Sequence, residues 1–167
     1  MSYYVRKIAR AKWPDDNCDI NLLPADAISD LRTTGNTLSF WRIDSLSDLD
    51  KAALALAASS KSDKIETVSL VWIDEAEIIQ DGFATDSTEG DTIVEDLSSL
   101  HRDCVGLTYA SLGNLSSLIV KSLQLNQYQR YTKQQVKNAL LGAFRDSRIS
   151  KDRCHPVLYE QLIKLNA

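Results

Sequence analysis

The chain has 167 residues, of which 44% are hydrophobic and 25% are charged, and its formal net charge is −4. This length fits one domain with a sizeable buried core, and the ordinary composition excludes a disordered or fibrous protein. Three widely spaced cysteines, Cys18, Cys104 and Cys154, exclude a disulfide framework.

Targeting signals are not evident in the chain. Residues 1–13 lack the long apolar core of a signal peptide, and no apolar run reaches the length of a membrane span. We therefore expect a soluble, cytoplasmic protein that does not contact a membrane.

Charge is spread unevenly along the chain. Residues 1–14 carry four basic side chains and no acidic one, residues 15–103 have a net charge of −14, and residues 104–167 have a net charge of +6. This asymmetry predicts an acidic face and a basic face, or two halves of one fold that attract each other.

The first predicted elements are a strand and a short helix. Residues 3–13 alternate loosely between apolar and polar, which predicts a strand that ends at Pro14, a residue without a ladder amide. After a loop at 14–19, we expect a short helix from Pro24 to about Arg32, with Gly35 just past its end.

The next segments continue the alternation of strands and helices. Residues 37–43 are rich in β-formers and predict a strand, and residues 44–59 combine serine caps with helical spacing. Residues 66–73 are apolar on both faces at their centre and predict a central strand. Residues 74–82 fit a helix or an edge strand, and residues 81–92 predict a mobile, acidic loop.

The C-terminal half is expected to be helical. Thr92 and Glu95 form a capping-box pattern, after which apolar residues recur at helical spacing toward an uncharged helix over 104–120. Such a helix must be covered on several sides, either within the monomer or by a partner. The residues expected at a partner interface are Tyr109, Leu112, Leu115 and Ile119.

Two further helices complete the chain. Thr132 and Gln135 form a second capping-box pattern ahead of an amphipathic helix, and Pro156 opens a last helix. The predicted fold class is α/β or α+β, with a small mixed sheet of about three strands and helices in the N-terminal half and a helical half packed on it. We expect an α/β subdomain over 1–92 and a helical subdomain over 93–167, joined in one compact domain.

The sequence His101-Arg102-Asp103 matches the start of a protein-kinase catalytic loop. That loop requires Asn five residues after its Asp, where this chain has Thr108, and neither a glycine-rich loop nor Asp-Phe-Gly is present. On a helix, Cys104 falls on the apolar face and His101 at its edge, so we expect a buried thiol and a hydrogen-bonded histidine.

Two Cys/His interpretations remain. His101 with Cys104 and Cys154 with His155 supply the ligand types of a zinc site, but adjacent residues rarely reach one metal, so we expect no metal. The second interpretation is that Cys104 is a catalytic nucleophile and His155 is its base, and no surrounding motif supports it.

Function is predicted from the absence of any catalytic motif. We expect a non-enzymatic protein-interaction or accessory subunit that acts through a protein partner or as an oligomer, with no catalytic residue and no cofactor. The alternative is a nucleic-acid-binding protein that uses the basic C-terminal helices, and the lesser alternative is a Cys/His-dependent enzyme. The basic residues expected to bind nucleic acid or a partner are Lys133, Lys137, Arg145, Arg148, Lys151 and Arg153. A solvated helix face would account for the same residues.

Overall fold

A computed structural model describes residues 1–14, 19 and 22–166. Cys18 and most of the predicted loop at 14–19 lie outside these residues. The strands are β1 (Tyr3–Lys7), β2 (Leu38–Ile43), β3 (Val68–Asp74), β4 (Ala84–Ser87), β5 (His101–Val105) and β6 (Tyr128–Tyr131). The helices are α1 (Ala25–Asp30), α2 (Leu49–Ala57), α3 (Glu75–Gln80), α4 (Tyr109–Gln124), α5 (Lys133–Arg145) and α6 (Pro156–Asn166). The 3₁₀ helices are η1 (Arg10–Lys12), η3 (Leu46–Asp48) and η4 (Glu95–Leu100).

The strands form one sheet in the order β4-β5-β2-β1-β3-β6, and every pairing between these strands is antiparallel. The three predicted strands are present as its centre, β2-β1-β3. The prediction of a small mixed sheet of about three strands is wrong, because β4, β5 and β6 extend it to six strands. Two of these, β5 and β6, come from the segment 93–167, which was expected to be purely helical.

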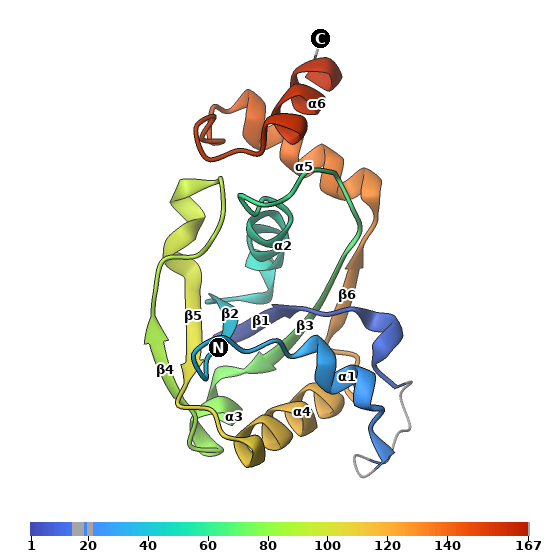
Figure 1. Cartoon of the computed structure of the whole chain (residues 1–167), viewed down its shortest axis with the longest axis vertical. Helices are drawn as coiled ribbons and strands as arrows, with labels where there is room; N and C mark the ends of the chain where they lie inside the picture. The colour runs from blue at the N-terminus through green and yellow to red at the C-terminus, as the bar shows by residue number, and fades with distance from the viewer. Residues whose placement is uncertain (15–18, 20–21, 167) are drawn as a thin grey trace.

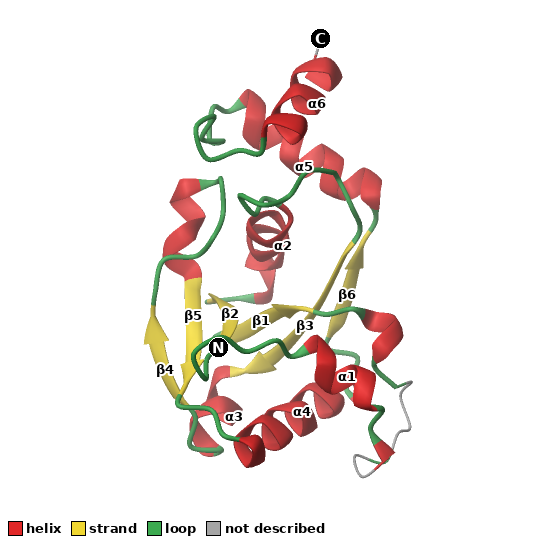
Figure 2. Cartoon of the chain, in the orientation of Figure 1, coloured by secondary structure: helices red, strands yellow, loops and turns green. Residues whose placement is uncertain are grey.

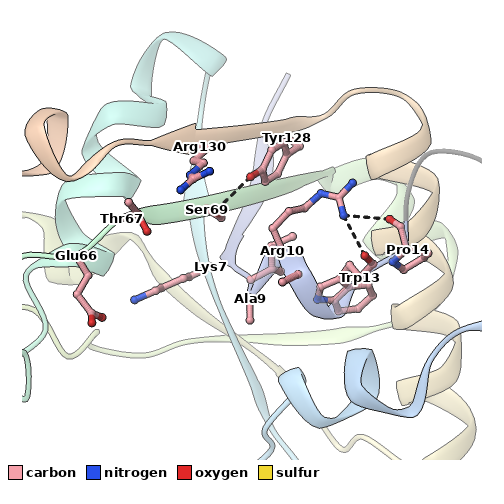
Figure 3. A pocket seen from close by; sticks show the side chains of 12 residues that line it. Lys7, Ala9, Arg10, Trp13, Pro14, Glu66, Thr67, Ser69, Tyr128 and Arg130 are labelled. Carbon is pink, nitrogen blue, oxygen red and sulfur yellow. Dashed lines mark hydrogen bonds between the residues drawn. The ribbon is translucent and has the colours of Figure 1, made fainter.

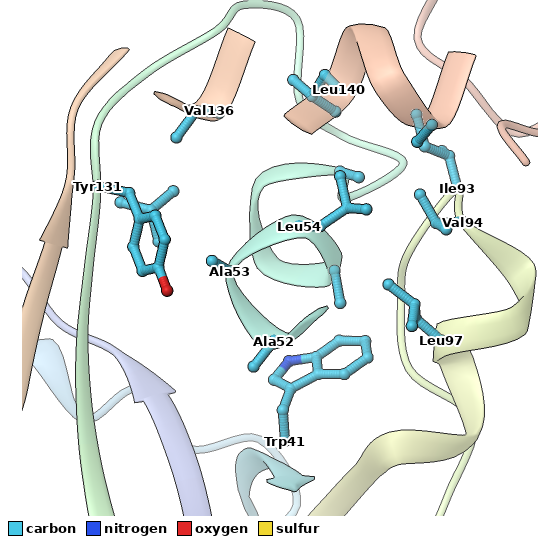
Figure 4. Close-up of a cluster of buried hydrophobic side chains, with 14 of the residues drawn as sticks. Trp41, Ala52, Ala53, Leu54, Ile93, Val94, Leu97, Tyr131, Val136 and Leu140 are labelled. Atoms are coloured by element: carbon cyan, nitrogen blue, oxygen red, sulfur yellow. The ribbon is translucent and has the colours of Figure 1, made fainter. Parts of the chain in front are cut away.

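Helices cover both faces of the sheet. Figures 1 and 2 show α2, α5 and α6 on one side and α1, α3 and α4 on the other. Side chains of β3 alternate accordingly, since Val68 and Leu70 join the first core and Val71 and Ile73 the second. Figure 4 shows the first core, in which Trp41 packs beside α2. The expectation of a strand buried on both faces is therefore confirmed for β3.

The segment after Thr92 differs most from its prediction. The Thr92 hydroxyl donates to the carbonyl of Ala58 (3.3 Å) and accepts from the amide of Val94, so it does not cap a helix. Residues 101–105 form β5 instead of a helix, because their backbone pairs with β2 on one side and β4 on the other. Pairing with two distant segments overrides the helical spacing of the local sequence.

The other helices agree closely with the sequence. The Thr132–Gln135 capping box opens α5, and α6 begins at Pro156. The ambiguous segment 74–82 contains helix α3, whose N-cap is Asp74. None of the described helices combines the length and apolar character that crossing a membrane requires.

Candidate functional site

A hollow of about 810 Å³ lies where β1, β3 and β6 meet (Figure 3). Three segments line it. Residues 7–11, 13 and 14 come from the end of β1 and the chain that follows, residues 66, 67 and 69 from the start of β3, and residues 128 and 130 from β6. Three segments that are far apart in the sequence therefore contribute to one site.

The first wall forms where β1 leaves the sheet. The amide of Ile8 still donates to the carbonyl of Ser69 (2.9 Å), but the next amide, of Ala9, donates to the Asp30 carboxylate (2.8 Å) on α1. The same carboxylate oxygen accepts from the indole of Trp13 (2.8 Å). Asp30 thus redirects the chain into η1 and places Arg10 beside β3 and β6 (Figure 3).

Arg10 is held in a defined position. Its Nη1 donates to the carbonyls of Trp13 (3.0 Å) and Pro14 (3.1 Å), and its guanidinium carbon lies 5.6 Å from the centre of the Tyr128 ring. Such cation–π contact and fixed hydrogen bonds reduce the conformational entropy that the side chain loses on binding a ligand.

The opposite wall comes from β6. Arg130 lies opposite Ser69 in the β3–β6 register, and Tyr128 lies opposite Val71. Because Tyr128 and Arg130 are two residues apart on a strand, they face the same side of the sheet. The Tyr128 hydroxyl and Ser69 Oγ are 3.2 Å apart, which fixes the ring against β3.

Most charged residues that line the hollow are basic, whereas the chain as a whole is acidic. Lys7, Arg10 and Arg130 supply three cations, and Glu66 is the one acidic residue of its lining. The Glu66 carboxylate binds Lys64 Nζ (2.8 Å), and this hydrogen bond lowers its pKa, with smaller electrostatic contributions from Lys64 itself, Lys7 and Lys133. Within the described part of the chain, Lys7 and Arg130 make no side-chain hydrogen bond and no ion pair. Their charge is available to a ligand.

The six predicted basic residues lie in α5 and in the segment between α5 and α6. Lys133 and Lys137 border a smaller hollow between α5 and α6. Arg145 donates to the Asn166 side chain (2.7 Å), and Arg148 pairs with Asp96 (2.6 Å). The remaining two residues precede α6: Lys151 lies over the Tyr159 ring, and Arg153 is exposed.

The predicted partner interface on α4 divides into two faces. Leu115 and Ile119 are 0% exposed and belong to the core beneath the sheet, and Leu112 is half-buried against the same core. Only Tyr109, at 94% exposure, projects into solvent. The uncharged helix is therefore covered within the monomer over most of its apolar side.

The Cys/His candidates occupy structural positions. Cys104 is buried as predicted, and burial raises the pKa of its thiol to about 12. His101 is hydrogen-bonded as predicted, through Nδ1 to Thr88 Oγ1 (2.7 Å). Cys104 and Cys154 belong to cores on opposite faces of the sheet, so they cannot share a metal with their neighbouring histidines. Among the described residues, no group of three or more His, Cys, Asp or Glu side chains is placed to hold a metal.

The hollow itself was not found from the sequence. Its signal was partly visible, because residues 1–14 carry only basic charge and Arg130 adjoins Tyr128 and Tyr131. These residues come together because β3 pairs with β1 on one side and β6 on the other, and local sequence patterns do not predict this pairing. Comparisons found no family model, no curated protein and no solved structure that matches this chain.

Proposed function

We propose that this chain is a non-catalytic binding protein that acts through a partner, and that the partner presents negative charge to the hollow between β1, β3 and β6. The observation that carries the proposal is the set of three cations from three separate elements around one hollow, in a chain whose net charge is −4. Concave surfaces lined by one sign of charge concentrate oppositely charged ligands.

A binding role is also supported by the state of the reactive side chains. The Cys104 thiol, whose pKa is about 12, stays protonated at neutral pH and is a poor nucleophile. Burial raises the pKa of Cys154 as well. The fixed geometry of Arg10 and the unpaired charges of Lys7 and Arg130 are features expected of a preorganised binding surface.

Retention on heparin–agarose tests the proposal, because heparin is a polyanion and an acidic protein has little reason to bind it. We expect the wild type to be retained at low salt, and the double variant Lys7→Gln/Arg130→Gln to elute at a clearly lower salt concentration. Each lost contact weakens the salt-dependent part of the interaction.

The matched control removes the same charge elsewhere. Arg153→Gln/Lys164→Gln changes two exposed cations near and on α6, and we expect it to elute with the wild type. Failure of the wild type to bind, or an equal loss in the α6 control, would contradict the proposed site.

A further inference from the structure

We infer that the hollow takes a segment of single-stranded nucleic acid, with its phosphates at Lys7 and Arg130 and a base against the Tyr128–Arg10 pair. This inference rests on the proposed function and specifies its ligand. A protein partner with an acidic segment is the competing ligand class, and the experiment below separates the two.

The stacking surface is the first part of the argument. The Tyr128 ring is fixed by its hydroxyl contact with Ser69, and the Arg10 guanidinium lies over that ring. Two backbone carbonyls hold the guanidinium in place. Unpaired bases stack on aromatic rings and on arginine planes, and this stacking tolerates different base sequences.

The phosphate contacts are the second part. Lys7 is on β1 and Arg130 on β6, the two strands that flank β3. Adjacent strands are about 4.8 Å apart, so these two cations begin on strands separated by roughly 10 Å. Figure 3 shows them on either side of the hollow with Ser69 between them. Lys7 lies opposite Leu70 and Arg130 opposite Ser69, so the two side chains leave β1 and β6 on opposite faces of the sheet and line the hollow from two sides. Cations on two sides of the hollow suit the repeating charge of a nucleic-acid backbone that crosses it.

The shape of the site favours a single strand. Duplex DNA is read by a helix or a β-ribbon that enters a groove, whereas here the cations and the ring line a concavity. A base can reach the Tyr128–Arg10 pair only when it is free of its own stack. The Asp and Glu side chains of an acidic peptide match the charge but supply no aromatic ring to stack on that pair.

Fluorescence anisotropy with a labelled short oligouridylate and oligothymidylate tests the inference, with a duplex of the same length and a polyglutamate peptide as comparison probes. We expect the single strands to bind more tightly than both. Tyr128→Leu should weaken single-strand binding about tenfold, and Tyr128→Phe, which keeps the ring and loses only the Ser69 contact, should bind more tightly than Tyr128→Leu. Lys7→Gln/Arg130→Gln should reduce the slope of log affinity against log salt by about 1.4.

The outcomes distinguish the two levels of the proposal. Single-strand binding that depends on the Tyr128 ring, with heparin retention unchanged in Tyr128→Leu, supports the inference. If heparin retention depends on Lys7 and Arg130 but the duplex or polyglutamate binds as well as the single strand, or Tyr128→Leu binds the oligonucleotides normally, the inference is wrong and the proposed function stands. If the heparin test also fails, both are wrong. Thermal unfolding of each variant confirms that the fold is intact.

Discussion

His101, the first residue of β5, contacts Thr88, which follows the neighbouring edge strand β4. Its Nδ1 is 2.7 Å from Thr88 Oγ1, and that hydroxyl donates to the Asp103 carboxylate (2.8 Å). Thr88 therefore accepts from a protonated Nδ1. The imidazole packs edge-on against Trp41, with ring centres 5.4 Å apart, and is 9% exposed. Burial of the ring disfavours its charged form and so favours the neutral ring.

The free energy of unfolding should consequently depend on pH, because His101 gains a proton more readily in the unfolded chain than in the folded one. Burial lowers the pKa of His101 below the ordinary value of 6.5. The negative charge of Asp103 raises this pKa by a smaller amount, and the positive charge of Arg102 lowers it by the smallest amount. Between the two pKa values the unfolded chain binds more protons than the folded chain, so the stabilisation is complete above about pH 6.5 and is lost as pH falls from there through the lower pKa of folded His101. Thermal unfolding midpoints measured across this range should show the loss. The variant His101→Gln should not, and parallel curves for the two proteins would contradict the prediction.

Helix α4 has one face packed in the core, and its first turn is exposed to solvent. Leu115 and Ile119 contribute fully buried side chains to the core on one face of the sheet, whereas Tyr109 projects from the first turn. We expect Leu115→Ala or Ile119→Ala to lower the free energy of unfolding by about 2–5 kcal/mol, because each leaves a cavity. Tyr109→Ala should change it by less than about 0.5 kcal/mol. Urea unfolding monitored by circular dichroism measures all three, and a small effect of both core variants would mean that this face of α4 is not packed on the sheet.

The elements that the sequence predicts well are those with local signals. The Thr132–Gln135 capping box and Pro156 mark the starts of α5 and α6 without reference to the rest of the chain. In contrast, β4 is short and exposed at every position, and β5 lies within residues 97–107, where apolar residues recur at helical spacing. These two strands exist because they pair with each other and because β5 also pairs with β2. Such pairing depends on distant segments and is invisible to a local pattern.

The candidate site follows the same division. Its charge was partly predictable from the basic run in residues 1–14, and Arg130 was visible as a cation beside two tyrosines. The predicted basic cluster lay farther along the chain, where the structure pairs Arg145 and Arg148 with Asn166 and Asp96. Only the antiparallel contacts of β3 with β1 and β6 bring the cations of the hollow together.

At the scale of the whole molecule, the sheet separates two cores, with helices on both of its faces (Figure 1). The hollow lies beside the β6 edge of the sheet. At the other edge, the paired residues Asp86 and Asp103 are acidic. Arg102, opposite Ser87 in the same strand pair, is basic, so this edge carries two carboxylates and one guanidinium on its paired strands. An anionic partner would be guided toward the β6 edge and away from the β4 edge.

The most direct test of this account is a map of where the ligand binds. Titration of the ¹⁵N-labelled full chain with a short oligouridylate, followed by amide chemical shifts, reports every region at once. We predict that the largest changes fall on residues 7–12, Ser69 and residues 128–130. Largest changes around Arg153 and α6 would contradict the central claim that the hollow between β1, β3 and β6 is the binding site. No changes at concentrations that saturate heparin binding would contradict the inference that its ligand is a single strand.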